Sequence, residues 1–197
     1  MKFGVIIVTY NRLSLLQECL LCAFDQTVPF HRILVVDNHS TDGTAQYLDS
    51  IDHPALSVLH LPENIGGAGG FARGLKEMAK SDCDWVLIID DDAMISPIYM
   101  EEISRAIAGS RYLAYSGTVE TEGAIDGSHR RLLANRCLMT YRPVPESAYQ
   151  GESFVYDVST FCGLVLKTSL IRRIGLPKAN YFIWFDDTEY CLRFRKY

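Results

Sequence analysis

The sequence predicts an α/β fold built on a doubly wound, mostly parallel sheet. Two patterns in the first 92 residues support this. Short, continuous apolar runs rich in Val and Ile recur, as expected of strands that are covered on both faces. The segments between these runs carry apolar residues at the spacing of a helix. Strand and helix therefore alternate, which is typical of a parallel sheet with helices on both sides.

The same patterns give the order of the expected elements. Strands are expected over residues 3–10, 32–37, 56–61 and 85–90. Helices are expected over residues 12–26, 40–51, 69–81 and 97–109. Later in the chain we expect a strand over 112–120, a strand followed by a short helix over 160–176, and a helical segment within 180–197. Residues 120–155 are rich in turn-forming residues and are expected to be irregular.

Length, charge and cysteine content limit the class of protein. A chain of 197 residues is most simply one domain, and a net charge of −5 gives no general affinity for nucleic acid or anionic membranes. Cys19 and Cys22 lie in a helical segment without the spacing of a zinc site, so we expect buried free thiols and a reducing, cytoplasmic setting. No signal peptide or membrane span is visible, and peripheral association with the inner face of a membrane stays open.

Polar residues follow each of the first four expected strands. Because the carboxyl ends of parallel strands meet at one edge of a sheet, and ligands bind there, these residues are expected to form one rim. Turn chemistry explains any one of these segments but explains all four together poorly. The candidate ligand-binding residues at this rim are Thr9, Tyr10, Asn11, Arg12, Asp37, Asn64, Gly67, Gly70, Arg73 and Asp91.

Three consecutive aspartates end the fourth strand, in the run WVLIIDDDA. Like charges this close repel, and none is easily buried. Side chains alternate in an extended segment, so Asp90 and Asp92 point one way and Asp91 the other. Carboxylate oxygens are the ligands that Mg²⁺ and Mn²⁺ prefer, usually together with substrate phosphates. Asp90 and Asp92 therefore predict a site for one of these ions.

The second and third strands offer groups suited to a nucleotide. Asp37 can accept hydrogen bonds from a ribose hydroxyl or a base N–H. The glycine-rich segment ENIGGAGGFARG offers unobstructed backbone amides for a diphosphate. It also contains a G-x-G-x-x-A pattern (Gly67, Gly69, Ala72) that is typical of dinucleotide-binding folds. That pattern belongs after the first strand, however, and here it follows the third.

A second acidic cluster lies near the end of the chain, in WFDDTEYCLR. Asp186, Asp187 and Glu189 are acidic, and Trp184 and Phe185 precede them. An aromatic wall beside a carboxylate suits the binding of a sugar and raises the basicity of the carboxylate by desolvation. The alternative is an exposed helix start, where acidic residues favour the helix dipole.

Several motifs together resemble one family. VIIVTYNR, ILVVDNHSTDGT, ENIGGAGGFARG, WVLIIDDDA, FCGLVLK and WFDDTEYCLR are similar, in this order, to motifs of the family 2 glycosyltransferases. Within that family the resemblance is greatest to galactofuranosyl- and rhamnosyltransferase-like members. It covers nearly the whole chain and implies the GT-A fold, a Rossmann-like sheet with its nucleotide-sugar site at the strand carboxyl ends.

The resemblance implies an inverting transfer of a sugar from a UDP- or dTDP-sugar to a hydroxyl of a glycan or lipid-linked glycan, as in polysaccharide biosynthesis. Asp90 and Asp92 would form the metal-binding D-x-D motif, Asp187 would be the general base, and Asp186 would orient a substrate. The nucleotide and diphosphate would be held by Thr9, Asp37, Asn64 and Arg73. Residues 1–92 would form a nucleotide-binding half, and residues 93–197 an acceptor-side half.

The chain departs from the family pattern in one respect. Related enzymes commonly supply a histidine metal ligand after the acidic motif, and here nothing follows Tyr197. The chain ends in a basic and aromatic run with no terminating residue, so we expect it to be truncated at its C-terminus. No histidine occupies the matching place, and we expect surface or turn positions for His31, His39, His53, His60 and His129.

Three other functions fit parts of the sequence. A sugar-nucleotide pyrophosphorylase shares the fold class and the metal, but it needs a basic, glycine-rich loop after the first strand, and TYNRLS is not one. A nicotinamide-dependent dehydrogenase rests on the misplaced glycine pattern alone. A nucleotide-binding module without catalysis would use the same rim.

Overall fold

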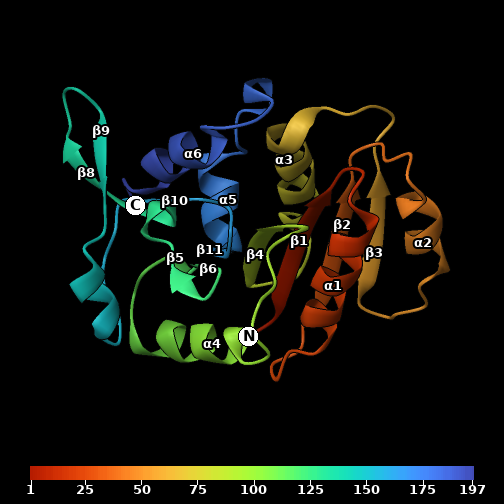
Figure 1. Ribbon diagram of the computed structural model, residues 1–197, viewed down its shortest axis with the longest axis horizontal. Helices are drawn as coiled ribbons and strands as arrows, with labels where there is room; N and C mark the ends of the chain where they lie inside the picture. The colour runs from red at the N-terminus through yellow and green to blue at the C-terminus, as the bar shows by residue number, and fades with distance from the viewer.

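A six-stranded sheet with strand order β3-β2-β1-β4-β11-β5 runs through the computed structural model, which describes residues 1–197 (Figure 1). Its four parallel strands come first in the chain, β1 (Phe3–Thr9), β2 (Arg32–Asp37), β3 (Leu56–His60) and β4 (Trp85–Asp90). β11 (Leu164–Lys167) lies antiparallel between β4 and β5 (Ala114–Ser116). The predicted mostly parallel α/β sheet is therefore confirmed.

Helices cover both faces of this sheet (Figure 1). On one face lie α1 (Leu13–Phe24), α2 (Thr44–Ser50) and α4 (Tyr99–Gly109). On the other lie α3 (Gly66–Met78), α5 (Thr168–Ile174) and α6 (Asp186–Phe194). Because β1 pairs with β2 on one side and with β4 on the other, the strand order reverses between β1 and β4. Ligands of such sheets bind in the crevice at this switch point.

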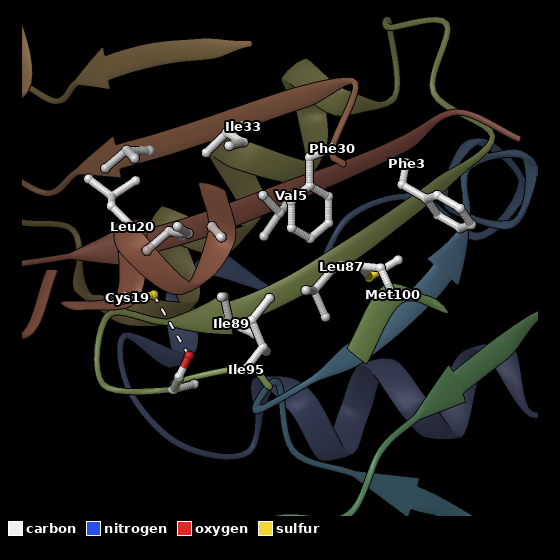
Figure 2. Close-up of a cluster of buried hydrophobic side chains, with 14 of the residues drawn as sticks. Phe3, Val5, Cys19, Leu20, Phe30, Ile33, Leu87, Ile89, Ile95 and Met100 are labelled. Carbon is white, nitrogen blue, oxygen red and sulfur yellow. Dashed lines mark hydrogen bonds between the residues drawn. The ribbon is translucent and has the colours of Figure 1, made fainter. Parts of the chain in front are cut away.

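The core follows from the alternation of apolar side chains along each strand. In β1, Val5 and Ile7 belong to the cluster under α1, whereas Ile6 and Val8 belong to the cluster under α3. Figure 2 shows the first cluster, in which side chains of α1, β2 and β4 pack around β1. Both faces are buried, so each strand has to be apolar throughout.

The first cluster also supports the loop that follows β4. Cys19 of α1 lies in this cluster (Figure 2), and its Sγ is 3.7 Å from the backbone oxygen of Ala93. Burial raises the pKa of the Cys19 thiol far above its usual value, so the thiol stays protonated and can donate to this oxygen. α1 therefore holds the turn that carries the aspartates against the core.

Glycines bring α3 close to the sheet on the other face. A Cβ atom on Gly70 would lie 2.6 Å from Val8 Cγ1, and one on Gly74 would lie 2.5 Å from Ile6 Cγ2. Any larger residue would push the helix away from β1. The start of α3 is therefore fixed relative to the end of β1.

Residues 120–155 were expected to be irregular, and this expectation was wrong. They contain one small hairpin, β6 (Glu120–Thr121) with β7 (Ala124–Ile125), and a larger one, β8 (Arg130–Asn135) with β9 (Thr140–Pro143). β10 (Val158–Ser159) joins β8 to form a three-stranded sheet. All of these strands are short, and β6, β7 and β9 are largely exposed, so they lack the apolar runs that predict a strand. The strand expected over 112–120 is shorter than predicted and is confined to β5. Three short 3₁₀ helices occupy Gly127–His129, Glu146–Gln150 and Ala179–Tyr181.

A buried arginine connects this small sheet to the main one. Arg130 is 1% exposed, and its guanidinium donates to the backbone oxygens of Gly117 (twice, at 2.8 and 3.1 Å), His129 (2.9 Å) and Cys162 (2.9 Å). Tyr99 of α4 reinforces the connection, because its hydroxyl accepts from Gly117 N–H, after β5, and donates to the backbone oxygen of Gly163, before β11. The residues that follow β5 and precede β11 are thus held together.

The state of the cysteines and the length of the helices relate to the expected cellular location. None of the six cysteines is in a disulfide, and Cys19 is buried as expected, whereas Cys22 is only partly buried. No helix combines the length and the apolar character needed to cross a bilayer.

Candidate functional site

The ends of β1 and β4 meet at the switch point. Thr9 Oγ1 donates to Asp91 Oδ2 at 2.7 Å. Arg12, at the start of α1, lies 2.8 Å from Asp92 and 3.4 Å from Asp91. The residues predicted after the first and fourth strands are therefore brought together, as the strand-end argument requires.

The ends of β2 and β3 are joined in the same way. Asp37, which is 2% exposed, accepts from Ser40 N–H at 2.9 Å and lies 2.8 Å from His60 Nδ1. Asn38 Nδ2 donates to Asn64 Oδ1 at 2.9 Å. Sequence reasoning left Asn38 out of the site, although its place directly after Asp37 was a usable signal.

The loop after β1 is fixed by the loop after β2. Asn11 has a positive φ of 52°, a conformation that asparagine tolerates better than most residues. Its Oδ1 accepts from Thr41 N–H at 2.7 Å, and its own N–H donates to Ser40 Oγ at 3.0 Å. Tyr10, next to it, is exposed at the rim.

The three aspartates differ in their surroundings, but Asp91 and Asp92 both contact Arg12, so the alternation of Asp90 and Asp92 against Asp91 stays a prediction. Asp91 is buried and turned toward Thr9 and Arg12, whereas Asp92 is exposed. Burial raises the pKa of Asp90 to about 7, and the charges of Asp92, Asp91 and Asp186 add to this effect. Burial also raises the pKa of Asp91, although the hydrogen bond from Thr9 and the charge of Arg12 work against it. Negative charge is therefore concentrated around Asp90.

A divalent cation fits this concentration of carboxylates. Asp90 and Asp92 offer hard oxygen donors, and Arg12 is the cation that faces them. No group of three or more His, Cys, Asp or Glu side chains gathers closely enough to enclose a metal ion. Such a pair of carboxylates suits an ion that takes its other ligands from phosphate and water.

The glycine-rich start of α3 is used differently from the expectation. Gly66 has a φ of 75°, and a Cβ there would lie 2.1 Å from the backbone oxygen of Phe182. That oxygen accepts from Ala68 N–H at 3.1 Å. Gly67 has no atom within 4 Å of its Cβ position, and its N–H has no protein partner. Of the predicted diphosphate-binding residues of this helix, Gly67 is thus the one with a free amide.

The other predicted residues of α3 lie away from this amide. Gly70 packs on β1, which accounts for a glycine there without a ligand. A Cβ on Gly69 would lie 2.6 Å from Ile65 Cγ1, so this glycine of the dinucleotide-like pattern serves local packing. Arg73 lies farther along the helix, is exposed, and makes no ion pair with the other candidate residues.

The second acidic cluster begins α6 and reaches the aspartates after β4. Asp186 is buried, burial and the neighbouring Asp187 raise its pKa to about 6, and its charge acts on Asp90. Asp187 Oδ1 accepts from the backbone N–H and the hydroxyl of Thr188. Glu189 pairs with a residue one turn later on the same helix, as the helix spacing predicts. The charge of Asp186 thus contributes to the raised pKa of Asp90, and Asp187 is bonded within its own helix.

An exposed segment that we call the aromatic strap precedes α6, and it consists of Tyr181, Phe182, Ile183, Trp184 and Phe185. Trp184 is 75% exposed. The strap has positive φ angles at Phe182, Trp184 and Phe185, a strained conformation for residues with a side chain. It is attached to the start of α3 through the Phe182 carbonyl. The predicted aromatic wall therefore lies beside both the acidic cluster and the glycine-rich segment.

Residues 4–170 match the family described as "Glycosyl transferase family 2". The chain belongs to this family. The family resemblance predicted from the motifs is thereby confirmed.

Relatives within the family are longer than this chain. The galactofuranosyltransferase GlfT1 of Mycolicibacterium smegmatis is 24% identical over 188 residues, which cover 93% of this chain and 62% of the relative. An uncharacterised glycosyltransferase of Bacillus subtilis, YwdF, is 24% identical and is covered to the same 62%. The chain spans about 62% of the length of these curated relatives.

Solved structures of glycosyltransferases share the GT-A fold of this chain. Staphylococcus aureus TarS in complex with UDP-GlcNAc has a TM-score of 0.72 and 22% identity, over 98% of this chain and 53% of TarS. The likeness confirms the predicted fold.

Proposed function

We propose that the protein is an inverting glycosyltransferase that moves a sugar from a UDP- or dTDP-sugar to a hydroxyl of a glycan acceptor. The observation that carries the proposal is the bond between the segment before α6 and the start of α3, where the Phe182 carbonyl accepts from Ala68 N–H at 3.1 Å, and the charge of Asp186 in α6 raises the pKa of Asp90. An acidic helix start from the second half of the chain thereby adjoins the aspartates at the switch point of the first. One site then holds groups suited to a diphosphate leaving group and groups suited to an acceptor.

The donor nucleotide is assigned to the rim formed by the first three strands. Asp37, Asn64 and Thr9 frame the place proposed for the ribose and base, with Tyr10 and Asn11 at its exposed edge. Gly67 offers a free amide to the diphosphate, and Arg12 and Arg73 offer positive charge. TarS, which shares the fold, has been solved in complex with UDP-GlcNAc, and this supports a UDP-sugar at the rim.

Asp90 and Asp92 are proposed to hold Mn²⁺ or Mg²⁺, with Asp91 turned away toward Thr9. When bound, such an ion offsets the charge that grows on a departing diphosphate. The concentration of carboxylates around Asp90 supports a cation here. A mannosyltransferase of Pyrobaculum calidifontis, with a TM-score of 0.64 to this chain, has been solved with GDP-Man and Mn²⁺.

Asp187 is proposed to be the general base. Successive residues of a helix point about 100° apart, so Asp186 and Asp187 cannot both face Asp90. Asp186 is the one that acts on Asp90, which leaves Asp187 for the acceptor side. The acceptor oxygen would bond to the anomeric carbon as the bond from that carbon to the diphosphate oxygen breaks. The hydroxyl proton would pass to Asp187, and attack opposite the leaving group inverts the configuration.

The aromatic strap is proposed to bind the acceptor sugar. Trp184 and Phe185 are exposed next to Asp186 and Asp187, and exposed aromatic rings suit the apolar face of a sugar. We further propose a glycan or lipid-linked glycan as the acceptor and a cytoplasmic location, with the possibility of contact with a membrane surface. The six free cysteines support a reducing compartment.

Titration calorimetry tests the donor and metal assignments. UDP or dTDP should bind more tightly with Mn²⁺ than with EDTA, and NAD should not bind. Asp92→Asn should abolish the effect of Mn²⁺ without changing the circular dichroism spectrum. A Mn²⁺ effect that persists in both Asp90→Asn and Asp92→Asn would rule out these ligands.

Turnover of matched carboxamide variants tests the base. A screen of UDP-sugars and dTDP-rhamnose for release of the nucleotide identifies the donor. With that donor, Asp187→Asn should lose about 10²–10⁴ in turnover, the usual range for a general base, and bind UDP normally. Asp186→Asn should affect substrate affinity more than the chemical step. The reverse result would exchange the two roles.

A further inference from the structure

The carboxylate of Asp187 is held by a chain of hydrogen bonds that begins on another element. The Thr188 hydroxyl donates to Asp187 Oδ1 at 3.0 Å, and the same hydroxyl oxygen lies 3.0 Å from Arg131 Nη2. A guanidinium can only donate, and a hydroxyl carries one proton. Arg131 must therefore donate to Thr188, which directs the Thr188 proton to Asp187.

Arg131 is itself fixed by the three-stranded sheet. It lies in β8, where its backbone pairs with Val158 of β10 and Pro143 of β9. Its guanidinium carbon is 5.6 Å from the centre of the Tyr141 ring in β9. The planar group is thus held by an aromatic ring and by Thr188, and its orientation is restricted.

One nitrogen of this guanidinium has no partner. Arg131 Nε is buried and makes no hydrogen bond. Buried polar groups are nearly always hydrogen-bonded, so this N–H is an exception, and the guanidinium makes its side-chain hydrogen bond through Nη2 to Thr188 instead. Thr188 is 5% exposed, so water cannot readily replace Arg131 at its hydroxyl.

We propose that Arg131 and Thr188 are positioning residues for Asp187, an inference that rests on the proposed role of Asp187 as the base. The backbone N–H and the hydroxyl of Thr188 both bond to Oδ1, so Oδ2 is left for the acceptor hydroxyl. With Oδ1 bonded to two donors, rotation of the carboxylate is restricted and Oδ2 keeps one direction. Arg131 and Thr188 act through Asp187 and need not touch the reacting atoms.

The experiment removes the hydroxyl without changing the size of the side chain. Thr188→Val breaks the connection, and Thr188→Ser keeps it. Thr168→Val is the matched control, because the Thr168 hydroxyl is also buried but has no partner. Arg131→Met removes the first donor, and Arg131→Lys keeps the charge without the planar fork. Each purified variant is assayed with the donor from the screen described above and titrated with UDP.

Thr188→Val and Arg131→Met should each lower kcat by roughly 10- to 100-fold, the loss expected when a reacting group is displaced by up to about 1 Å. The donor KM and the Kd for UDP should change less than about twofold, because neither residue belongs to the donor rim. Thr188→Ser should retain most of the activity, and Thr168→Val all of it. The double variant Arg131→Met/Thr188→Val should be no slower than either single variant, because both break one chain of bonds.

The outcomes separate this proposal from the proposed function. If Thr188→Val keeps full turnover while Asp187→Asn loses it, Asp187 is the base and the positioning role is wrong. If Asp187→Asn keeps its turnover, or if no donor is turned over, the proposed function fails and the positioning role fails with it. If Thr188→Val does not fold, the positioning role stands only if Thr188→Ser stays active and Arg131→Lys loses kcat with unchanged UDP affinity.

Discussion

On the side of the site formed by residues 1–92, several polar side chains follow a parallel strand and bond to the loop of a neighbouring strand. Thr9 with Asp91 and Asn38 with Asn64 are examples. On the side formed by residues 93–197, Asp186 and Asp187 begin a helix after an exposed strap. Their surroundings depend on the small sheet and its two arginines, Arg130 and Arg131.

The difference shows two ways of placing a functional group. Groups at strand ends take their position from the whole sheet, where many apolar contacts and ladder hydrogen bonds share the task. Groups on the side formed by residues 93–197 depend on a few long-range hydrogen bonds made by single side chains. Single substitutions should therefore have larger effects on that side than at the rim.

The largest effect on stability is expected from Arg130→Met. Hydrogen bonds to a charged donor contribute about 1.5–3 kcal/mol each, and three buried carbonyl groups would lose theirs, so the free energy of unfolding should fall by about 4–5 kcal/mol or more. Urea denaturation followed by circular dichroism measures this loss.

The matched control is Arg32→Met, on the side formed by residues 1–92. Arg32 makes one long contact of 3.4 Å, to Ser57 Oγ. Its replacement should change the free energy of unfolding by no more than about 0.5 kcal/mol, as is usual for surface substitutions. Equal losses in the two variants would contradict the comparison between the two sides.

An intermediate effect is expected where α3 packs on β1. The Cβ of Gly70→Ala would lie 2.6 Å from Val8 Cγ1, and such overpacking costs about 1–3 kcal/mol. Gly67→Ala meets no atom within 4 Å and should instead stabilise the helix by about 0.5–1 kcal/mol. Urea denaturation of both variants gives the sign of each change. A destabilised Gly67→Ala variant would show that this position is not open.

The smallest effect is expected at His60, where the rim carries a titrating pair. Partial burial opposes the charge on the His60 ring, yet hydrogen bonds to Asp37 and Asp49 raise its pKa above the usual value. The stabilisation is therefore complete below the unfolded pKa of about 6.5 and is lost as the pH rises through the folded pKa. The free energy of unfolding of the wild type should exceed that of His60→Asn at low pH, and this difference should shrink by about 0.2–1 kcal/mol as the pH rises through the folded pKa.

The control for this titration is His39→Asn. His39 has a positive φ of 69°, which asparagine tolerates, and it has no carboxylate partner. This variant removes an imidazole from the same rim without breaking an ion pair, so it measures the effect of losing the ring alone. If the unfolding free energy of His39→Asn, relative to the wild type, depends on pH as strongly as that of His60→Asn, the ion pair of His60 with Asp37 is not the cause.

The parallel part of the fold and its rim could be predicted from the sequence. Strands covered on both faces must be apolar throughout, so β1 to β4 stand out, and the residues that follow them meet by geometry alone. Thr9, Asp37, Asn64 and the three aspartates were found in this way. Asp186 and Asp187 were found as an acidic cluster beside Trp184 and Phe185, which strand-end reasoning alone does not reach, and the family resemblance added only their roles.

The remainder depends on contacts between residues far apart in the chain. Short strands such as β8 and β9 have no apolar alternation, so periodicity cannot reveal them. Nothing in the letters RRLLAN shows that Arg130 is buried under backbone carbonyls or that Arg131 reaches Thr188. The glycine-rich segment suggested a diphosphate site, whereas the structure places the Phe182 carbonyl against its first glycine, Gly66.

The exposure of Trp184 has a practical consequence for spectroscopy. The chain contains two tryptophans, and the other, Trp85, is 5% exposed and packs against Tyr115 in the core. Quenching of intrinsic fluorescence by acrylamide should therefore act almost entirely on Trp184. A molecule that settles on the aromatic strap would shield this indole, while the emission of Trp85 stays constant as an internal reference. The protein thus contains its own optical probe at the place proposed for the acceptor.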